Sequence, residues 1–260
     1  MTTPLDLRPA PGAAPLGTMI LRQAVMETRL LLRNGEQVLL ALVIPLLVLV
    51  AGTESDRVVD LGSGRPIDVI TPGVLALAVM STSFTSLAIA TGFERRSNVL
   101  KRLGASPLPR VGLLAGKIGA VVAVQVVQLT VLCVAALLLG WDPQGGAGAF
   151  GGALLLVVLG TAAFGALGLL MAGTLRAEAT LALANLVYVL LLVGGAVLVP
   201  VDRYPSFVQP LTTLLPSGAL GEGLRACFDG RGPGAAAVVV LLVWAGVASA
   251  GVARTFRWDS

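Results

Sequence analysis

The stretch IGAVVAVQVVQLTVLCVAALLLGW, residues 118–141, contains no charged residue over a length that can cross a lipid bilayer. The hydrocarbon core of a bilayer is about 30 Å thick, and an α-helix needs about 20 apolar residues to span it. The segment is expected to be helical because backbone amides in lipid have no water to bond. Transmembrane β-strands would instead alternate apolar and polar residues in short segments.

Similar apolar windows recur along the chain. Together they predict six transmembrane helices, at about 37–53, 69–92, 111–140, 149–174, 180–200 and 233–253. Hydrophobic residues make up 56% of the chain and charged residues only 12%, which is about half of the charged fraction of a soluble domain. The sequence therefore predicts an all-α integral membrane protein in which residues 18–260 form one transmembrane domain.

The N-terminal region precedes the first of these windows. Residues 1–17 are rich in Pro, Ala and Gly without periodicity, which is typical of a disordered tail. Residues 18–33 mix apolar side chains with Arg22, Glu27 and Arg29. This mixture favours an amphipathic helix that lies in the membrane interface. A cytoplasmic extension of the first membrane helix is the alternative.

The basic residues indicate the orientation. With both termini in the cytoplasm, the outer side holds only five of the 18 Lys and Arg residues, namely Arg57, Arg65, Arg203, Arg225 and Arg231. Cytoplasmic loops of membrane proteins carry the excess of basic residues, so we expect the N-in, C-in orientation. The net charge of +4 then reflects topology and not a nucleic-acid partner. Two lysines against sixteen arginines, with abundant Ala, Gly and Val, suggest a GC-rich bacterium and hence its cytoplasmic membrane.

The longest expected outer segment contains an unusual apolar stretch. Residues Tyr204–Gly221 carry no charge but include Pro205, Pro210 and Pro216. The prolines break the stretch too often for a membrane span, and its apolar character does not suit a solvent loop. A re-entrant pair of short helices that dips into the outer leaflet fits better.

The residue types argue against catalysis within this chain. It has no histidine, which removes imidazole bases and ligands, and Cys133 and Cys227 are not expected to meet. A membrane-embedded enzyme, the rival hypothesis, would need acid, base or metal-binding groups within the membrane. Gly112–Ile118 departs from a phosphate-binding loop, so ATP hydrolysis would need a separate polypeptide. We expect Lys117 to extend toward the inner-leaflet headgroups.

The link between the second and third expected spans reads FERRSNVLKRLGASPLPR, residues 93–110. Phe93, Leu100 and Leu103 have helical spacing and predict an amphipathic helix over residues 94–103. Gly104 and Pro107 would end it. Nothing in the link would cover its apolar face. The segment could bind a partner protein, or it could be a positive-inside anchor that only fixes topology.

Polar residues inside the expected spans are candidates for lining a transport path. They are Ser83, Ser86, Gln125, Gln128, Asn185 and Tyr188. The alternative is structural, because buried polar side chains in lipid usually bond across helices.

The 93–110 segment resembles the corresponding link of the ABC-2 type permease family, and in particular of its daunorubicin-type exporters. The matching residues are Glu94, Arg95, Leu100, Lys101, Arg102, Leu103, Pro107, Leu108 and Arg110, whereas Ser97-Asn98 stands where that family usually has Gly-Thr. The stretch LLPSGALGEGLR, residues 214–225, is similar to the family's Pro-containing segment before the last helix.

This resemblance implies two permeases around a path, powered by two cytoplasmic ATPases that bind ATP and magnesium, so the permease itself needs no cofactor. It implies a coupling helix that docks on the ATPase, formed by Glu94, Arg95, Val99, Leu100, Lys101, Arg102, Leu103, Pro107 and Arg110. It implies a second inner contact at Leu175, Arg176 and Glu178. The expected function is outward transport of an amphipathic, drug-like or lipid-like substrate among membrane lipids. The alternative is export of a lipid-linked polysaccharide or glycolipid.

Overall fold

The computed structural model describes residues 12, 14–33, 35–53, 65–104 and 107–256. Its helices are α1 (Leu16–Arg33), α2 (Gly35–Thr53), α3 (Pro66–Met80), the π-helix η2 (Ser81–Ser86), α4 (Leu87–Arg96), α5 (Val99–Gly104), α6 (Arg110–Leu138), α7 (Gly146–Thr174), α8 (Ala177–Gly194), the 3₁₀-helix η3 (Val201–Arg203), α9 (Gln209–Leu214), α10 (Pro216–Phe228) and α11 (Ala235–Thr255). Within the described ranges, the only strand-like pairing is one bridge between Gln144 and Asp229. Most of the expected tail, 1–17, lies outside the described residues, and its last two residues belong to α1.

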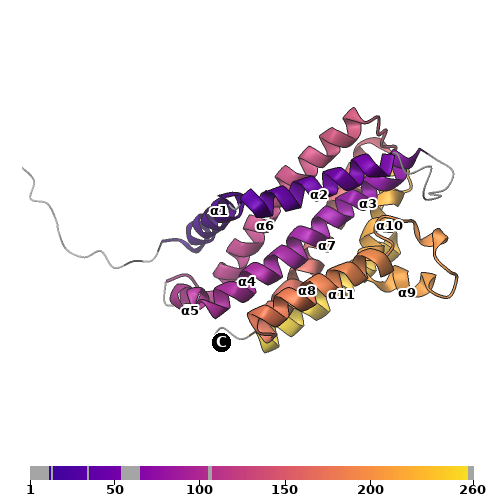
Figure 1. Cartoon of the computed structure of the whole chain (residues 1–260). Coiled ribbons are helices and arrows are strands. Elements are labelled where there is room, and N and C mark those ends of the chain that lie inside the picture. The colour runs from indigo at the N-terminus through magenta and orange to yellow at the C-terminus, as the bar shows by residue number, and fades with distance from the viewer. Residues whose placement is uncertain (1–11, 13, 34, 54–64, 105–106, 257–260) are drawn as a thin grey trace, which may run out of the picture.

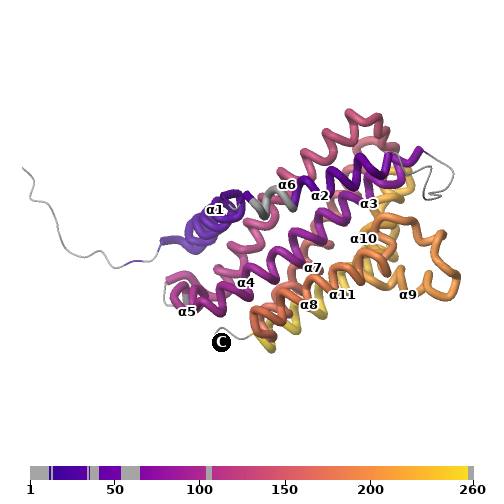
Figure 2. Tube along the Cα trace, in the orientation of Figure 1, coloured from indigo at the N-terminus to yellow at the C-terminus, as the bar shows by residue number. Residues whose placement is uncertain are grey.

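The long helices form a single bundle. Figure 1 shows them running side by side, with α1 and α5 at one end and α9 and α10 at the other. We call these the α5 end and the α10 end. Helix α7 packs against α11, α10 and α4, and α1 packs along α6. Figure 2 traces the same arrangement and shows that the C-terminal part of α11 returns to the α5 end.

Among the residues that the structure describes, five helical segments are long and apolar enough to cross a membrane. They are Pro66–Arg96, Arg110–Leu138, Gly146–Thr174, Ala177–Gly194 and Ala235–Thr255. The first is continuous through α3, η2 and α4. The apolar part of α2 is shorter than these five segments. It covers Ala41–Thr53, the part of the helix whose side chains are described. The outward faces of the bundle carry exposed Leu and Val side chains, which is the opposite of a soluble surface and suits contact with lipid.

The expected span at 180–200 is wrong at its C-terminal end. Helix α8 stops at Gly194, and Gly195 and Ala196 form a turn in which Ala196 has a φ of 49°. The irregular chain that follows is buried, with Val197 only 1% exposed. Apolarity in this stretch therefore reflects burial within the protein and not a continuing helix.

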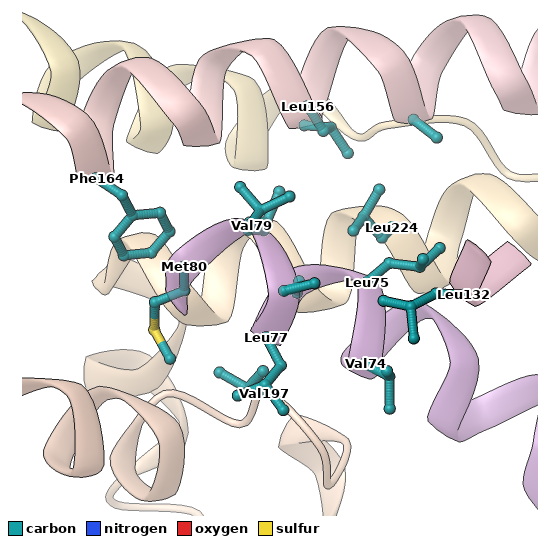
Figure 3. Close-up of a cluster of buried hydrophobic side chains, with 14 of the residues drawn as sticks. Val74, Leu75, Leu77, Val79, Met80, Leu132, Leu156, Phe164, Val197 and Leu224 are labelled. Atoms are coloured by element: carbon teal, nitrogen blue, oxygen red, sulfur yellow. The ribbon is translucent and has the colours of Figure 1, made fainter. Parts of the chain in front are cut away.

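The core lies where α3 crosses α6, α7 and α10. Figure 3 shows Leu75 and Val79 of α3 facing Leu132, Leu156 and Leu224 from those three helices. Each of the five is at most 5% exposed. Because lipid tails are as apolar as leucine, such contacts stabilise the bundle through close van der Waals packing and not through removal from water.

Glycines let the helices approach closely around η2. A Cβ atom on Gly168 of α7 would lie 2.8 Å from the carbonyl oxygen of Phe84 and 3.3 Å from that of Ser83. Close backbone approach at small residues is a usual way to pack helices in membranes. The π-helical turn thus sits directly on the glycine face of α7.

Gly168→Ala should therefore lower the stability of the protein. The added methyl group must displace the backbone of η2, and overpacking of this kind costs about 1–3 kcal/mol. The matched control is Gly151→Ala in the same helix, where a Cβ meets nothing within 4 Å. Thermal unfolding of the detergent-solubilised variants checks this, and equal midpoints for the two would contradict the packing described here.

Candidate functional site

The predicted coupling segment, residues 94–103, is divided between two helices. Helix α4 ends at Arg96, residues 97 and 98 form a turn, and α5 begins at Val99. Asn98 has a φ of 58°, a left-handed conformation that Asn tolerates better than most residues. The Ser97 hydroxyl donates to the carbonyl oxygens of Phe93 at 3.0 Å and Glu94 at 3.2 Å. The predicted amphipathic helix over 94–103 is therefore wrong, and its apolar residues do not share one face.

This break also changes which apolar side chains are uncovered. Leu100 is 1% exposed, so the chain's own fold covers it, and Leu103 is half-buried. The exposed apolar residues are Phe93 at 39% and Val99 at 37%. The expectation of an uncovered stripe through Leu100 and Leu103 is thus wrong, because the turn at Asn98 points Leu100 into the protein.

The remaining residues predicted for coupling lie at the surface, except for two. Lys101, Arg102, Pro107 and Arg110 are exposed, Glu94 is half-buried, and Arg95 is buried.

The two predicted inner contacts form one surface. The Arg95 guanidinium donates to the carbonyl oxygen of Leu175, in the turn between α7 and α8. Arg96 forms an ion pair with Glu178 at the start of α8, and both side chains are exposed. The sequence placed these contacts 80 residues apart. We call the exposed set Phe93, Arg96, Val99, Lys101, Arg102, Arg176 and Glu178 the coupling surface.

Lys117 lies inside the protein and does not extend toward lipid headgroups. Its side chain is 3% exposed, and its Nζ lies 3.0 Å from Glu27 Oε1 of α1 and also pairs with Glu94 of α4. The Gln23 side-chain amide donates to the same Glu27 oxygen at 2.9 Å. We call Lys117, Glu27 and Glu94 the ion cluster. Sequence reasoning missed it, and the only signal was an acidic residue in an otherwise Arg-bearing helix.

Gln125 and Gln128 of α6 bond across the bundle. The Gln125 amide donates to Ser83 Oγ at 3.3 Å and accepts from Thr161 at 2.9 Å. The Gln128 amide accepts from Thr82 at 2.7 Å and donates to the Ala41 carbonyl at 2.6 Å. These bonds join η2 to α6, α7 and α2. They favour the structural interpretation for Ser83, Gln125 and Gln128.

A small cavity of about 40 Å³ lies between α1, α2, η2 and α6. Glu27, Thr82, Ser86, Lys117 and Ala120 are among the residues that line it. Its volume suits a few water molecules. Ser86 is thus next to a cavity, as a residue of a path would be.

Asn185 and Tyr188 of α8 have different surroundings although they are three residues apart. Tyr188 is half-buried and hydrogen-bonded to Ser81 of η2. Asn185 is exposed on the outward face of α8, among the exposed Leu181, Leu186 and Val189. An amide on such an apolar face suits an aqueous path or a second protein surface better than lipid.

The α10 end is held by one buried arginine. Arg225 of α10 donates to the carbonyl oxygens of Ala196 at 3.1 Å and Val197 at 2.5 Å, and to Glu222 at 2.7 Å. Burial lowers the pKa of Arg225, and Glu222 opposes that change. Arg225 and Glu222 also line a cavity of about 530 Å³ with Arg65 and Asp202. Within the described part of the chain, no three His, Cys, Asp or Glu side chains come together as a metal site.

Leu100→Ala should destabilise the permease, whereas Val99→Ala should not. Emptying a buried leucine site costs about 2–5 kcal/mol, and a half-exposed surface position is usually within about 0.5 kcal/mol of neutral. Thermal unfolding of both variants gives the comparison. Equal midpoints would show that the turn at Asn98 does not bury Leu100.

Comparison with known families agrees with this arrangement. The family model described as ABC-2 type transporter matches residues 19–228. The match runs from α1 to the end of α10 and contains the coupling surface and the ion cluster. None of the curated proteins matches the chain. Since the family model covers most of the sequence, the chain belongs to the ABC-2 type transporter family.

Proposed function

We propose that this chain is the membrane subunit of an ABC exporter that moves an amphipathic, drug-like or lipid-like substrate outward across a bacterial cytoplasmic membrane. The observation that carries the proposal is the coupling surface. It joins two segments from distant parts of the chain at one end of the bundle, and it carries apolar and basic side chains that the chain leaves uncovered. A separate ATPase that binds ATP and magnesium would cover it.

The proposed topology has six spans, with both termini inside. Helix α2 supplies the sixth span, since its 19 residues extend about 28 Å at 1.5 Å per residue. Helix α1 would lie in the inner interface, because it turns exposed Leu21 and Leu30 away from the bundle. Helices α9 and α10 would form the re-entrant pair. Phe207, just before α9, is 83% exposed, and Leu211 of α9 is 62% exposed.

A second permease copy would complete the path. Asn185 supports this role for the outward face of α8, because an exposed amide there needs a polar environment. Ser86 beside the cavity and half-buried Tyr188 would contribute to the same route. The mixture of one amide with leucines and valines suits an amphipathic substrate. Export of a lipid-linked polysaccharide or glycolipid remains the alternative, and neighbouring glycosyltransferase genes would favour it.

Topology can be tested with two single cysteines at exposed positions. Ser206→Cys, between η3 and α9, should react with an impermeant thiol reagent in intact cells. Ser97→Cys, between α4 and α5, should react only after the membrane is opened. The native Cys227 is buried and Cys133 half-buried, so the unmodified protein serves as the blank. Reaction of Ser97→Cys in intact cells would overturn the orientation.

Phe93→Asp and Val99→Asp should each weaken binding of the ATPase. The exposed part of either side chain contributes only a fraction of the roughly 1.5–3 kcal/mol of full burial, but Asp would also place an unpaired charge in the contact, which costs several kcal/mol. Co-purification should therefore fall at least about tenfold. Both side chains are partly exposed, so thermal unfolding of the permease should change less than in Leu100→Ala. The matched control is Thr255→Asp, exposed at the end of α11. Wild-type recovery of the ATPase with both variants would remove the coupling role from this surface.

A further inference from the structure

We propose that Lys117 is a positioning residue that links the coupling surface to α1, so that docking or closure of the ATPase moves α1. This inference rests on the proposed function. It adds that the ion cluster carries the motion and that α1 is the element that moves.

The most deeply buried side chains of α1 are polar, and half-buried Ile20 and Ala24 pack beside them against α6. Leu21 is 62% and Leu30 59% exposed, whereas Gln23 and Glu27 are each 8% exposed. The helix thus turns a mixed polar and apolar face to the protein and leaves several large apolar side chains exposed on its outward side. No apolar side chain among the described residues of α1 is fully buried, so the polar pair Gln23 and Glu27 makes the deepest contacts of α1 with the bundle.

The contact between α1 and α6 is close and follows the glycines of α6. A Cβ on Gly116 would lie 2.5 Å from Gln23 Cγ, and one on Gly119 would lie 3.1 Å from Ala24 Cβ. This close approach of α1 to α6 brings Glu27 within ion-pair distance of Lys117. The position of α1 is therefore defined by its packing on the α6 glycines and by the ion cluster beside them.

The ion cluster holds two carboxylates and one ammonium group from three helices. Removing the ammonium group leaves Glu27 and Glu94 facing each other without a counter-charge in a buried place, which is strongly unfavourable. Replacing a whole buried ion group with well-packed apolar residues of similar volume is often neutral for stability, and uncharged residues of similar size likewise leave no unpaired charge. The position of α1 on α6 thus depends on Lys117, because Lys117 neutralises the two carboxylates. Without those carboxylates, α1 would not need Lys117 to stay in place.

The cluster continues directly into the coupling surface. Glu94 is followed in α4 by Arg95 and Arg96, which contact the Leu175 carbonyl and Glu178. A shift of this last turn of α4 relative to α8 moves the Glu94 carboxylate. Lys117 must then follow Glu94 or lose it, and its bond to Glu27 passes the change to α1.

Movement of α1 would open the cavity that it covers. Glu27 and Leu31 of α1 form one wall, opposite Thr82, Ser86 and Ala120. Ala120 is 1% exposed with α1 in place. An opened wall would admit the amphipathic substrate from the inner leaflet.

The first test uses the permease alone, with Ala120→Cys as a reporter. The rate of its reaction with a membrane-permeant maleimide is measured by mass spectrometry of the modified peptide, which separates it from Cys133 and Cys227. Lys117→Met should raise this rate at least about tenfold, because the unneutralised carboxylates displace α1. The control Arg29→Met removes an exposed charge from α1 and should leave the rate unchanged. A wild-type rate in Lys117→Met would overturn the proposal.

The second test separates coupling from stability. The uncharged triple variant Lys117→Met, Glu27→Gln, Glu94→Gln should return the reporter to the slow rate, because no buried charge is left to displace α1. With the co-purified ATPase, a non-hydrolysable ATP analogue should change the rate in the otherwise wild-type reporter but not in the triple variant. An equal response in both would overturn the coupling role. Failure of any ATPase to co-purify would contradict the proposed function itself.

Discussion

The bundle depends on one constraint, which is that backbone polar groups in an apolar setting must find partners inside the protein. Regular helix supplies those partners along most of the chain. Where the helix is interrupted, side chains take over. The Gln125 amide donates to the Val79 carbonyl at 3.3 Å beside η2, and Arg225 donates to Ala196 and Val197 beyond the end of α8. Polar residues thus occur within apolar stretches because they bond the backbone groups that the irregular segments leave without helical partners.

The same constraint explains why the ends of the bundle differ from its middle. At the α10 end, Arg225 fixes a non-helical chain and closes one side of a charged cavity. At the α5 end, the ion cluster and the Arg95 contact tie α1, α4, α6 and the α7–α8 turn together. Buried charges need partners from other helices, so each end becomes a place where several elements meet at one side chain.

The sequence predicted the helical architecture well because apolar length is a local property. It could not predict where burial replaces lipid contact, so the expected span at 180–200 continued past Gly194. It also could not place Lys117, whose partner Glu27 lies 90 residues away. Leu100 was assigned to an uncovered face because helical spacing ignores a left-handed turn at Asn98. Among the path candidates, spacing paired Asn185 with Tyr188, but only packing separates the exposed amide from the half-buried ring.

The chain's two lysines allow a direct measurement of whether the coupling surface faces the ATPase. Lys101 is exposed in α5 and Lys117 is buried, so an amine-reactive cross-linker should act on the former. Cross-linking mass spectrometry of the co-purified complex should therefore join Lys101 to the ATPase. A complex in which the ATPase is present and Lys101 reacts, but never with the ATPase, would contradict the account.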